Sequence, residues 1–280
     1  MRLDLLRETV YSFISLFGLI RGAPMLRSRL SVVVALALLA SACGAAESDF
    51  EAREFKDAEG HVLKYRLLKP AKYDPKEKYP LVIFFHGAGE RGDDNAAQTK
   101  WGIGELDKAE TRTKYPCFAI APQCPKDKKW SDANWQAATH TMKEKPTEPM
   151  AQTLELVAAL QKEFSIDEKR LYVTGLSMGG FGTWDLACRY PEKFAAAAPV
   201  CGGADLTKAP LIARLPIWVF HGADDPTVKV SCSRDMVAAL KKAGGDPKYT
   251  EYPGVGHAAW VPAYADPKFW EWLFAQKKAN

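Results

Sequence analysis

Short apolar segments recur along the chain and alternate with segments of helical periodicity. Five apolar runs have the length and continuity of strands buried on both faces; they cover residues 81–85, 118–121, 170–174, 194–200 and 217–220. Three segments with apolar residues at helical spacing predict helices; they cover residues 150–164, 179–190 and 231–243. Buried strands alternating with helices predict an α/β domain, with a mostly parallel central sheet and helices on both faces.

Two segments depart from this alternation. Residues 55–68 hold two short alternating stretches around a turn with Gly60, which predicts an N-terminal antiparallel hairpin. Residues 126–149 contain two Trp and two Pro and match neither pattern, so we expect a long connection over the sheet edge. With no internal repeat or low-complexity linker, residues 47–280 are expected to form one domain.

The start of the chain has the pattern of an export signal. Residues 25–29 hold two Arg, residues 30–42 are mostly apolar and end in small residues, and Cys43 follows. The apolar run is too short to span a bilayer, which needs about 18 apolar residues or more. We therefore expect residues 1–46 to be an N-terminal extension and leader of an exported protein.

Two alternatives for this leader stay open. The signal pattern begins at Met25, so residues 1–24 are an upstream extension, unless an amphipathic segment over residues 5–20 has its own role. The ending before Cys43 resembles a bacterial lipobox. Lipidation of Cys43 would anchor the protein to a membrane, and simple cleavage near residues 45–46 would leave it periplasmic or secreted.

Composition and charge exclude several classes of partner. The 280 residues are 47% hydrophobic and 26% charged, as in ordinary globular proteins. The net charge is +4, but residues 1–42 hold five Arg against Asp4 and Glu8, so the body is nearly neutral and no nucleic acid partner is expected. Cys117 and Cys124 are spaced too widely for a usual zinc pair and no HExxH occurs, so neither a metal nor a cofactor is predicted.

Gly175-Leu-Ser-Met-Gly179 is the candidate nucleophile motif. It matches G-x-S-x-G, follows a predicted buried strand and opens a predicted helix, as a nucleophile elbow does. The glycines fit a sharp, strained turn, because a side chain on either flank would collide with the neighbouring strand or helix. We predict Ser177 as the nucleophile; an incidental serine in a glycine-rich turn is the alternative.

A serine nucleophile requires a histidine base, which a carboxylate holds in the correct tautomer. In the elbow architecture the chain order is Ser, then Asp or Glu, then His. Only His221 and His257 follow Ser177. His221 ends a strand ahead of the acids, which favours a structural role in a turn, so His257 is the predicted base. Three carboxylates that follow strands are candidate acids; they are Asp225, Asp224 and Asp205.

Acyl transfer also requires two N–H groups that meet the oxyanion of the tetrahedral intermediate. Met178, directly after the nucleophile, is predicted to supply one. The second is expected from the loop that follows residues 81–85, where Ala88 is preferred and Gly89 is the alternative. His86 precedes the nucleophile, so we expect it to brace this loop.

Four motifs together resemble a known family. They are His86-Gly-Ala-Gly-Glu-Arg-Gly-Asp-Asp-Asn95, Gly175-Leu-Ser-Met-Gly-Gly-Phe-Gly-Thr-Trp-Asp185, His221-Gly-Ala-Asp-Asp-Pro226 and Gly254-Val-Gly-His257. Over residues 50–276 the chain resembles the exported bacterial α/β-hydrolases called predicted peptidases. That group is similar to polyhydroxybutyrate depolymerase-like and feruloyl-type esterases and to the prolyl oligopeptidase catalytic domain.

This resemblance implies an α/β-hydrolase fold with Ser177 as nucleophile, Asp225 as acid and His257 as base. Asp225 is chosen among the acids because it directly precedes a Pro-x-Val segment, as the acid does in the family. Lys229 and Ala258 depart from the family pattern, which has Pro and an acidic residue there. Both lie beside the predicted site, so the substrate preference does not carry over.

The leading hypothesis is an exported serine hydrolase that cleaves small or polymer-linked carboxylic esters through an acyl-enzyme. Trp130, Trp135 and Trp260 are candidates to line an aromatic or acyl pocket, with anchoring of core or loop as the alternative. A serine peptidase of prolyl oligopeptidase type is the second hypothesis. The third is a catalytically silent binding module on a hydrolase scaffold.

Overall fold

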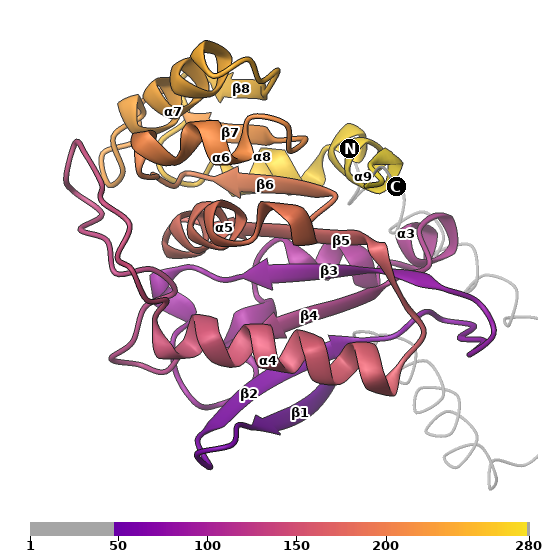
Figure 1. Cartoon of the computed structure of the whole chain (residues 1–280). Helices are drawn as coiled ribbons and strands as arrows, with labels where there is room; N and C mark the ends of the chain where they lie inside the picture. Colours follow the sequence, from indigo (N-terminus) through magenta and orange to yellow (C-terminus); the bar gives the residue numbers. More distant parts are fainter. Residues whose placement is uncertain (1–47, 279–280) are drawn as a thin grey trace, which may run out of the picture. The chain divides into compact units, whose positions relative to one another are not determined.

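The computed structural model describes residues 48–278, which form an eight-stranded sheet with helices on both faces (Figure 1). The strands are β1 (Glu51–Lys56), β2 (Val62–Leu68), β3 (Tyr79–Phe85), β4 (Phe118–Pro122), β5 (Ile166–Leu176), β6 (Ala196–Val200), β7 (Trp218–Gly222) and β8 (Lys248–Tyr252). The α-helices are α3 (Ala109–Lys114), α4 (Glu148–Glu163), α5 (Met178–Arg189), α6 (Ala209–Ile212), α7 (Ser231–Lys242), α8 (Trp260–Ala265) and α9 (Pro267–Ala275). The predicted leader and Cys43 lie outside the described residues.

The sheet has the predicted mixed topology. Its strand order is β1-β2-β4-β3-β5-β6-β7-β8. β2 pairs antiparallel with both β1 and β4, and the remaining neighbours are parallel. The hairpin turn between β1 and β2 uses Gly60 at a φ of 92°, a conformation that glycine adopts without a Cβ penalty. The α/β prediction with an N-terminal antiparallel hairpin is therefore confirmed.

Both faces of the sheet are covered by helices, which explains the continuous apolar runs. Along β3, Leu81, Ile83 and Phe85 belong to the core under α4, α5, α6 and α7. The alternating Val82 and Phe84 belong to the second core, under α8 and α9. The helices predicted over residues 150–164, 179–190 and 231–243 correspond to α4, α5 and α7. Within residues 48–278, no helix combines the length and apolarity needed to cross a membrane.

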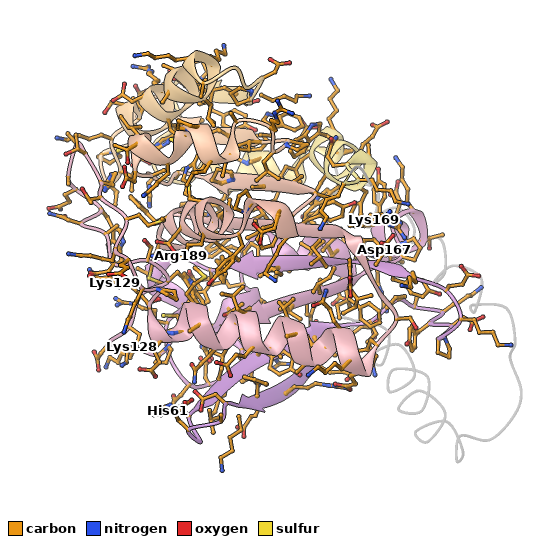
Figure 2. The ribbon with its side chains drawn as sticks, in the orientation of Figure 1. His61, Lys128, Lys129, Asp167, Lys169 and Arg189 are labelled. Atoms are coloured by element: carbon orange, nitrogen blue, oxygen red, sulfur yellow. The ribbon has the colours of Figure 1, made fainter. Side chains whose placement is uncertain are left out.

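The long connection between β4 and α4 lies beyond the carboxyl ends of the parallel strands (Figure 1). Figure 2 labels Lys128 and Lys129 on this connection and Arg189 at the end of α5. Arg189 donates hydrogen bonds of 2.7 Å to the carbonyl oxygens of Lys143 and Glu144. One arginine thus fastens a segment that has no helix or strand of its own.

Asp185 positions the Arg189 side chain for its hydrogen bonds to the long connection. The two side chains form an ion pair of 2.6 Å and are only 6% and 8% exposed. Ser131, on the connection, donates a further hydrogen bond of 3.1 Å to the Asp185 carboxylate. The pair is spaced i, i+4 on α5, so the helix presents both partners to the loop.

The cysteines of the described residues are buried thiols without a disulfide; they are Cys117, Cys124, Cys188, Cys201 and Cys232.

Candidate active site

Ser177 lies on a sharp turn between β5 and α5. Its backbone has a φ of 54°, in the left-handed region that non-glycine residues rarely adopt. A residue larger than glycine does not fit at position 179, because a Cβ there would lie 1.9 Å from the carbonyl oxygen of Phe85. The glycines of the motif therefore permit a close strand–helix contact that leaves the serine at the carboxyl edge of the sheet.

The structure brings Ser177, His257 and Asp225 together from three elements. His257, in the loop between β8 and α8, has its Nε2 2.8 Å from Ser177 Oγ. Its Nδ1 lies 2.7 Å from Oδ2 of Asp225, which follows β7. A carboxylate only accepts, so Nδ1 carries the proton and Nε2 is left to accept the serine hydroxyl. This is the geometry in which an imidazole activates a hydroxyl nucleophile.

The Asp225 carboxylate is fully buried yet well supplied with donors. Oδ1 accepts backbone N–H groups from Thr227 at 2.8 Å and Val228 at 2.9 Å. Oδ2 lies 3.2 Å from His221 Nε2 as well as 2.7 Å from His257. Burial alone would raise the pKa of Asp225, but the hydrogen bonds from His221, His257 and the two amides outweigh it and hold that pKa well below the ordinary value. The carboxylate is therefore an anion across the neutral pH range.

The other two candidate acids have different roles. Asp224 is exposed and its neighbour Asp225 turns inward. Asp205 accepts the Thr207 N–H at 3.0 Å and caps the short helix that starts there. It also accepts the backbone N–H of Met142 at 3.0 Å and so ties down the long connection.

The predicted oxyanion loop lies against the nucleophile. A Cβ at Gly87 would lie 3.7 Å from Ser177 Cβ. Ala88 opens the 3-10 helix η2 (Ala88–Glu90) and Met178 opens α5. The first N–H groups of a helix have no partner within it, so neither of these two N–H groups is used by its own helix.

His86 stabilises this loop through hydrogen bonds at both ring nitrogens. Its ring nitrogens lie 2.6 Å from the Gly87 carbonyl oxygen and 2.9 Å from the Cys124 backbone nitrogen, whose N–H it accepts. The ring is therefore neutral, with its proton on Nδ1. Burial lowers the pKa of His86 to about 4. Trp130, fully buried, donates to the His86 carbonyl oxygen at 3.1 Å and belongs to the core, not to a pocket wall.

Three tryptophan side chains lie near the site. Trp260 meets the His257 ring edge-on, with ring centroids 5.2 Å apart. Trp101 lies beyond it, at 6.4 Å from Trp260, and donates to the Glu90 carboxylate at 3.2 Å. Trp135 lines a hollow of about 340 Å³ whose lining includes Thr227, two residues after Asp225. Trp101 and Glu90 were not predicted as site residues. Glu90 lies within the motif of residues 86–95 and Trp101 follows that motif, and this position is the only feature of the sequence that could have identified them.

Among the described residues, Cys201, Asp225 and His257 lie close enough to share a metal ion. Asp225 and His257 already bond to each other, and burial raises the pKa of the Cys201 thiol to about 12. A metal would have to displace that hydrogen bond and a thiol proton, so these donors fit the hydrogen-bonded arrangement better than a metal site.

Comparisons with known proteins agree with this fold. The family model described as "Dienelactone hydrolase family" matches residues 115–268. A crystallised thermostable esterase superposes with a TM-score of 0.75 at 42% identity, covering 82% of this chain and 64% of that one. An uncharacterized secreted protein of Arthroderma benhamiae is 26% identical over 242 residues, which are 71% of this chain and 24% of that protein. Carboxylesterase SOBER1 of Arabidopsis thaliana is 25% identical over 200 residues, covering 64% of this chain and 83% of that enzyme.

Proposed function

Because the chain belongs to the dienelactone hydrolase family, we propose that it is a serine hydrolase that cleaves carboxylic esters. The observation that supports this most is the unbroken series of hydrogen bonds from Ser177 through His257 to Asp225. It stands on a fold shared with a thermostable esterase. The substrate is an ester whose acyl carbon can reach the serine between the oxyanion loop and the His257 ring.

The reaction proceeds in two halves. Ser177 Oγ bonds to the ester carbonyl carbon while its proton passes to His257 Nε2, and Asp225 stabilises the imidazolium. The N–H groups of Ala88 and Met178 donate to the oxyanion. Collapse breaks the bond to the alcohol, which takes the proton from His257 and leaves an acyl-enzyme. Water then gives a proton to His257 Nε2 as its oxygen bonds to the acyl carbon. The bond between that carbon and Ser177 Oγ breaks, Oγ takes the proton back from His257, and the carboxylic acid is released.

Hydrolysis of p-nitrophenyl acetate, butyrate and octanoate, beside a prolyl p-nitroanilide, tests this proposal on the full chain. We expect ester turnover that falls by at least about 10³-fold in Ser177→Ala. Asp225→Asn should lower kcat by about 10⁴-fold, because the amide no longer holds the right tautomer. Asp224→Asn is the matched control, since it makes the same change one residue away on an exposed side chain, and it should leave kcat unchanged.

The alternatives give different results in the same assay. Preferential cleavage of the anilide, lost in Ser177→Ala, would favour the serine peptidase. Absence of turnover together with absence of fluorophosphonate labelling of Ser177 would favour the catalytically silent binding module. Either result would contradict the esterase proposal.

We also propose that the protein is exported. The signal-like pattern up to Cys43 supports this, as does the similarity to a protein named as secreted. Mass spectrometry of the protein recovered from a bacterial host would find a mature chain starting near residues 43–47. Retention of the full leader on a cytoplasmic product would contradict export, and a diacylglyceryl mass on Cys43 that is absent in Cys43→Ser would distinguish lipidation from simple cleavage.

A further inference from the structure

A second histidine touches the carboxylate that orients His257. His221 lies on β7, four residues before Asp225, and its side chain is fully buried. Its Nε2 is 3.2 Å from Asp225 Oδ2 and 3.0 Å from the carbonyl oxygen of Val228. Its Nδ1 is 2.7 Å from the hydroxyl of Ser233 on α7.

These contacts determine the state of the His221 ring. Nε2 faces a carboxylate and a carbonyl oxygen, both of which only accept, so it must carry a proton. Nδ1 faces a hydroxyl, which can donate to it, so the ring is satisfied as the neutral imidazole. Ser233 is itself fully buried, so no water competes for this contact. The ring is thereby held at both nitrogens, with its Nε2–H between the Val228 carbonyl oxygen at 3.0 Å and the Asp225 carboxylate at 3.2 Å.

We propose that His221 is a positioning residue of the hydrolytic site, which orients Asp225 and spreads its charge. This inference rests on the proposed function. Oδ1 is held by the amides of Thr227 and Val228, and Oδ2 is shared between two imidazoles. Since the last torsion of an aspartate is broad, a carboxylate with fewer donors turns more freely. Loss of the His221 N–H would therefore loosen the alignment of His257 with Ser177.

The neighbouring thiols and Glu251 do not change charge near neutral pH. Burial raises the pKa of the Cys201 thiol to about 12 and raises that of Cys232 as well, so both stay protonated. Glu251, beside His221 in the sheet, is paired with Arg234, which with Tyr249 lowers its pKa to about 2. A shift in the pH profile of a His221 variant therefore reports on the Asp225–His257 pair.

The test compares His221→Phe with His221→Gln. Phe keeps a buried ring and removes the donor, whereas the Gln amide can donate toward Asp225 and accept from Ser233. Removing a residue that orients a metal-binding histidine lowers activity by roughly 10- to 100-fold. By analogy, we expect His221→Phe to lower kcat by a factor of that order, with KM little changed. The acidic limb of its kcat/KM profile should move to higher pH, because a carboxylate with fewer donors holds the His257 proton more strongly. His221→Gln should recover most of both.

Ser233→Ala checks whether the effect passes through His221. It should lower kcat in the wild-type background and have no further effect in His221→Phe, a non-additivity typical of coupled residues. Wild-type kcat and an unshifted profile in His221→Phe, with only a lower melting temperature, would overturn the proposal, and so would failure of Gln to recover activity.

One readout separates this inference from the proposed function. The low-field proton resonance of the His257–Asp225 hydrogen bond needs no substrate and should shift or broaden in His221→Phe. An unchanged resonance would contradict the role of His221 even if ester turnover depends on Ser177. Conversely, absence of ester turnover would contradict the esterase while a shifted resonance still supported the positioning role.

Discussion

Acidification should destabilise the protein through His86 before most of its carboxylates titrate. The ordinary pKa of histidine is 6.5, and burial lowers the pKa of His86 to about 4 in the folded chain. Between these values the unfolded chain binds a proton that the folded chain excludes, so the free energy of unfolding falls as the pH falls. At 1.36 kcal/mol for each pH unit, the loss is about 2 kcal/mol between pH 6.5 and 5 and about 3 kcal/mol by pH 4.

Burial is the main cause of the lowered pKa of His86, and the hydrogen bond at Nε2 also opposes protonation. Nε2 accepts the Cys124 N–H, and a proton there would set two donors face to face in a site that is 1% exposed. Nδ1 keeps its proton and its hydrogen bond to the Gly87 carbonyl oxygen when Nε2 is protonated, so the contact that is lost is the one with the Cys124 N–H, and the expected effect is on stability.

Urea unfolding followed by tryptophan fluorescence from pH 4.5 to 7.5 measures this loss. His86→Gln removes the titration, so the free energy of unfolding of this variant should depend less on pH than that of the wild type by about 2 kcal/mol over pH 5 to 6.5. His61→Gln, the same change at an exposed histidine, should retain the wild-type slope. Burial also lowers the pKa of His140, which adds to the pH dependence of the wild type and of both variants. The test therefore compares the pH dependence of the variants with that of the wild type and does not rely on the slope of any one protein. Equal slopes for wild type and His86→Gln would refute the reasoning.

Three further perturbations follow from the packing of the site. Gly179→Ala should lower the free energy of unfolding by more than about 3 kcal/mol in denaturant, because the new Cβ would lie 1.9 Å from a backbone carbonyl oxygen. A Cβ at Gly89 has no neighbour within 4 Å, so Gly89→Ala should change the free energy of unfolding by less than about 0.5 kcal/mol. Arg189→Ala leaves Asp185 buried without its partner and should cost about 3 to 5 kcal/mol; an unchanged urea midpoint would contradict the anchoring of the long connection. The lowered pKa of Asp225 stabilises the fold above the ordinary aspartate pKa of 3.8, and this contribution is lost progressively as the pH falls below that value. The melting-temperature gap between wild type and Asp225→Asn should therefore be constant near neutral pH and shrink steadily below pH 3.8; a gap that does not shrink there would count against this reasoning.

The sequence alone determined seven of the eight strands of the sheet, all but β8, and the turn at Ser177. Both depend on local signals, namely apolar runs of strand length and glycines at positions 175 and 179, where a side chain would strike neighbouring backbone. The predictions named none of β8, α8 and α9. β8 reads Lys-Tyr-Thr-Glu-Tyr and lies at the sheet edge, and the two short helices are stabilised by packing on the second face of the sheet, which no local pattern encodes.

Only the tertiary structure decided what surrounds the candidate nucleophile. From the residues alone, Asp205, Asp224 and Asp225 were open as acids, and the family resemblance selected the last. In the folded chain Asp225 points inward to His257 and Asp224 is exposed, while Asp205 accepts a hydrogen bond from the Met142 N–H of the long connection. The contact of His221 with Asp225 was likewise not predicted. Such distances depend on how β7, α7 and two loops pack against one another, and hydrophobic pattern and motif spacing carry no information about that packing.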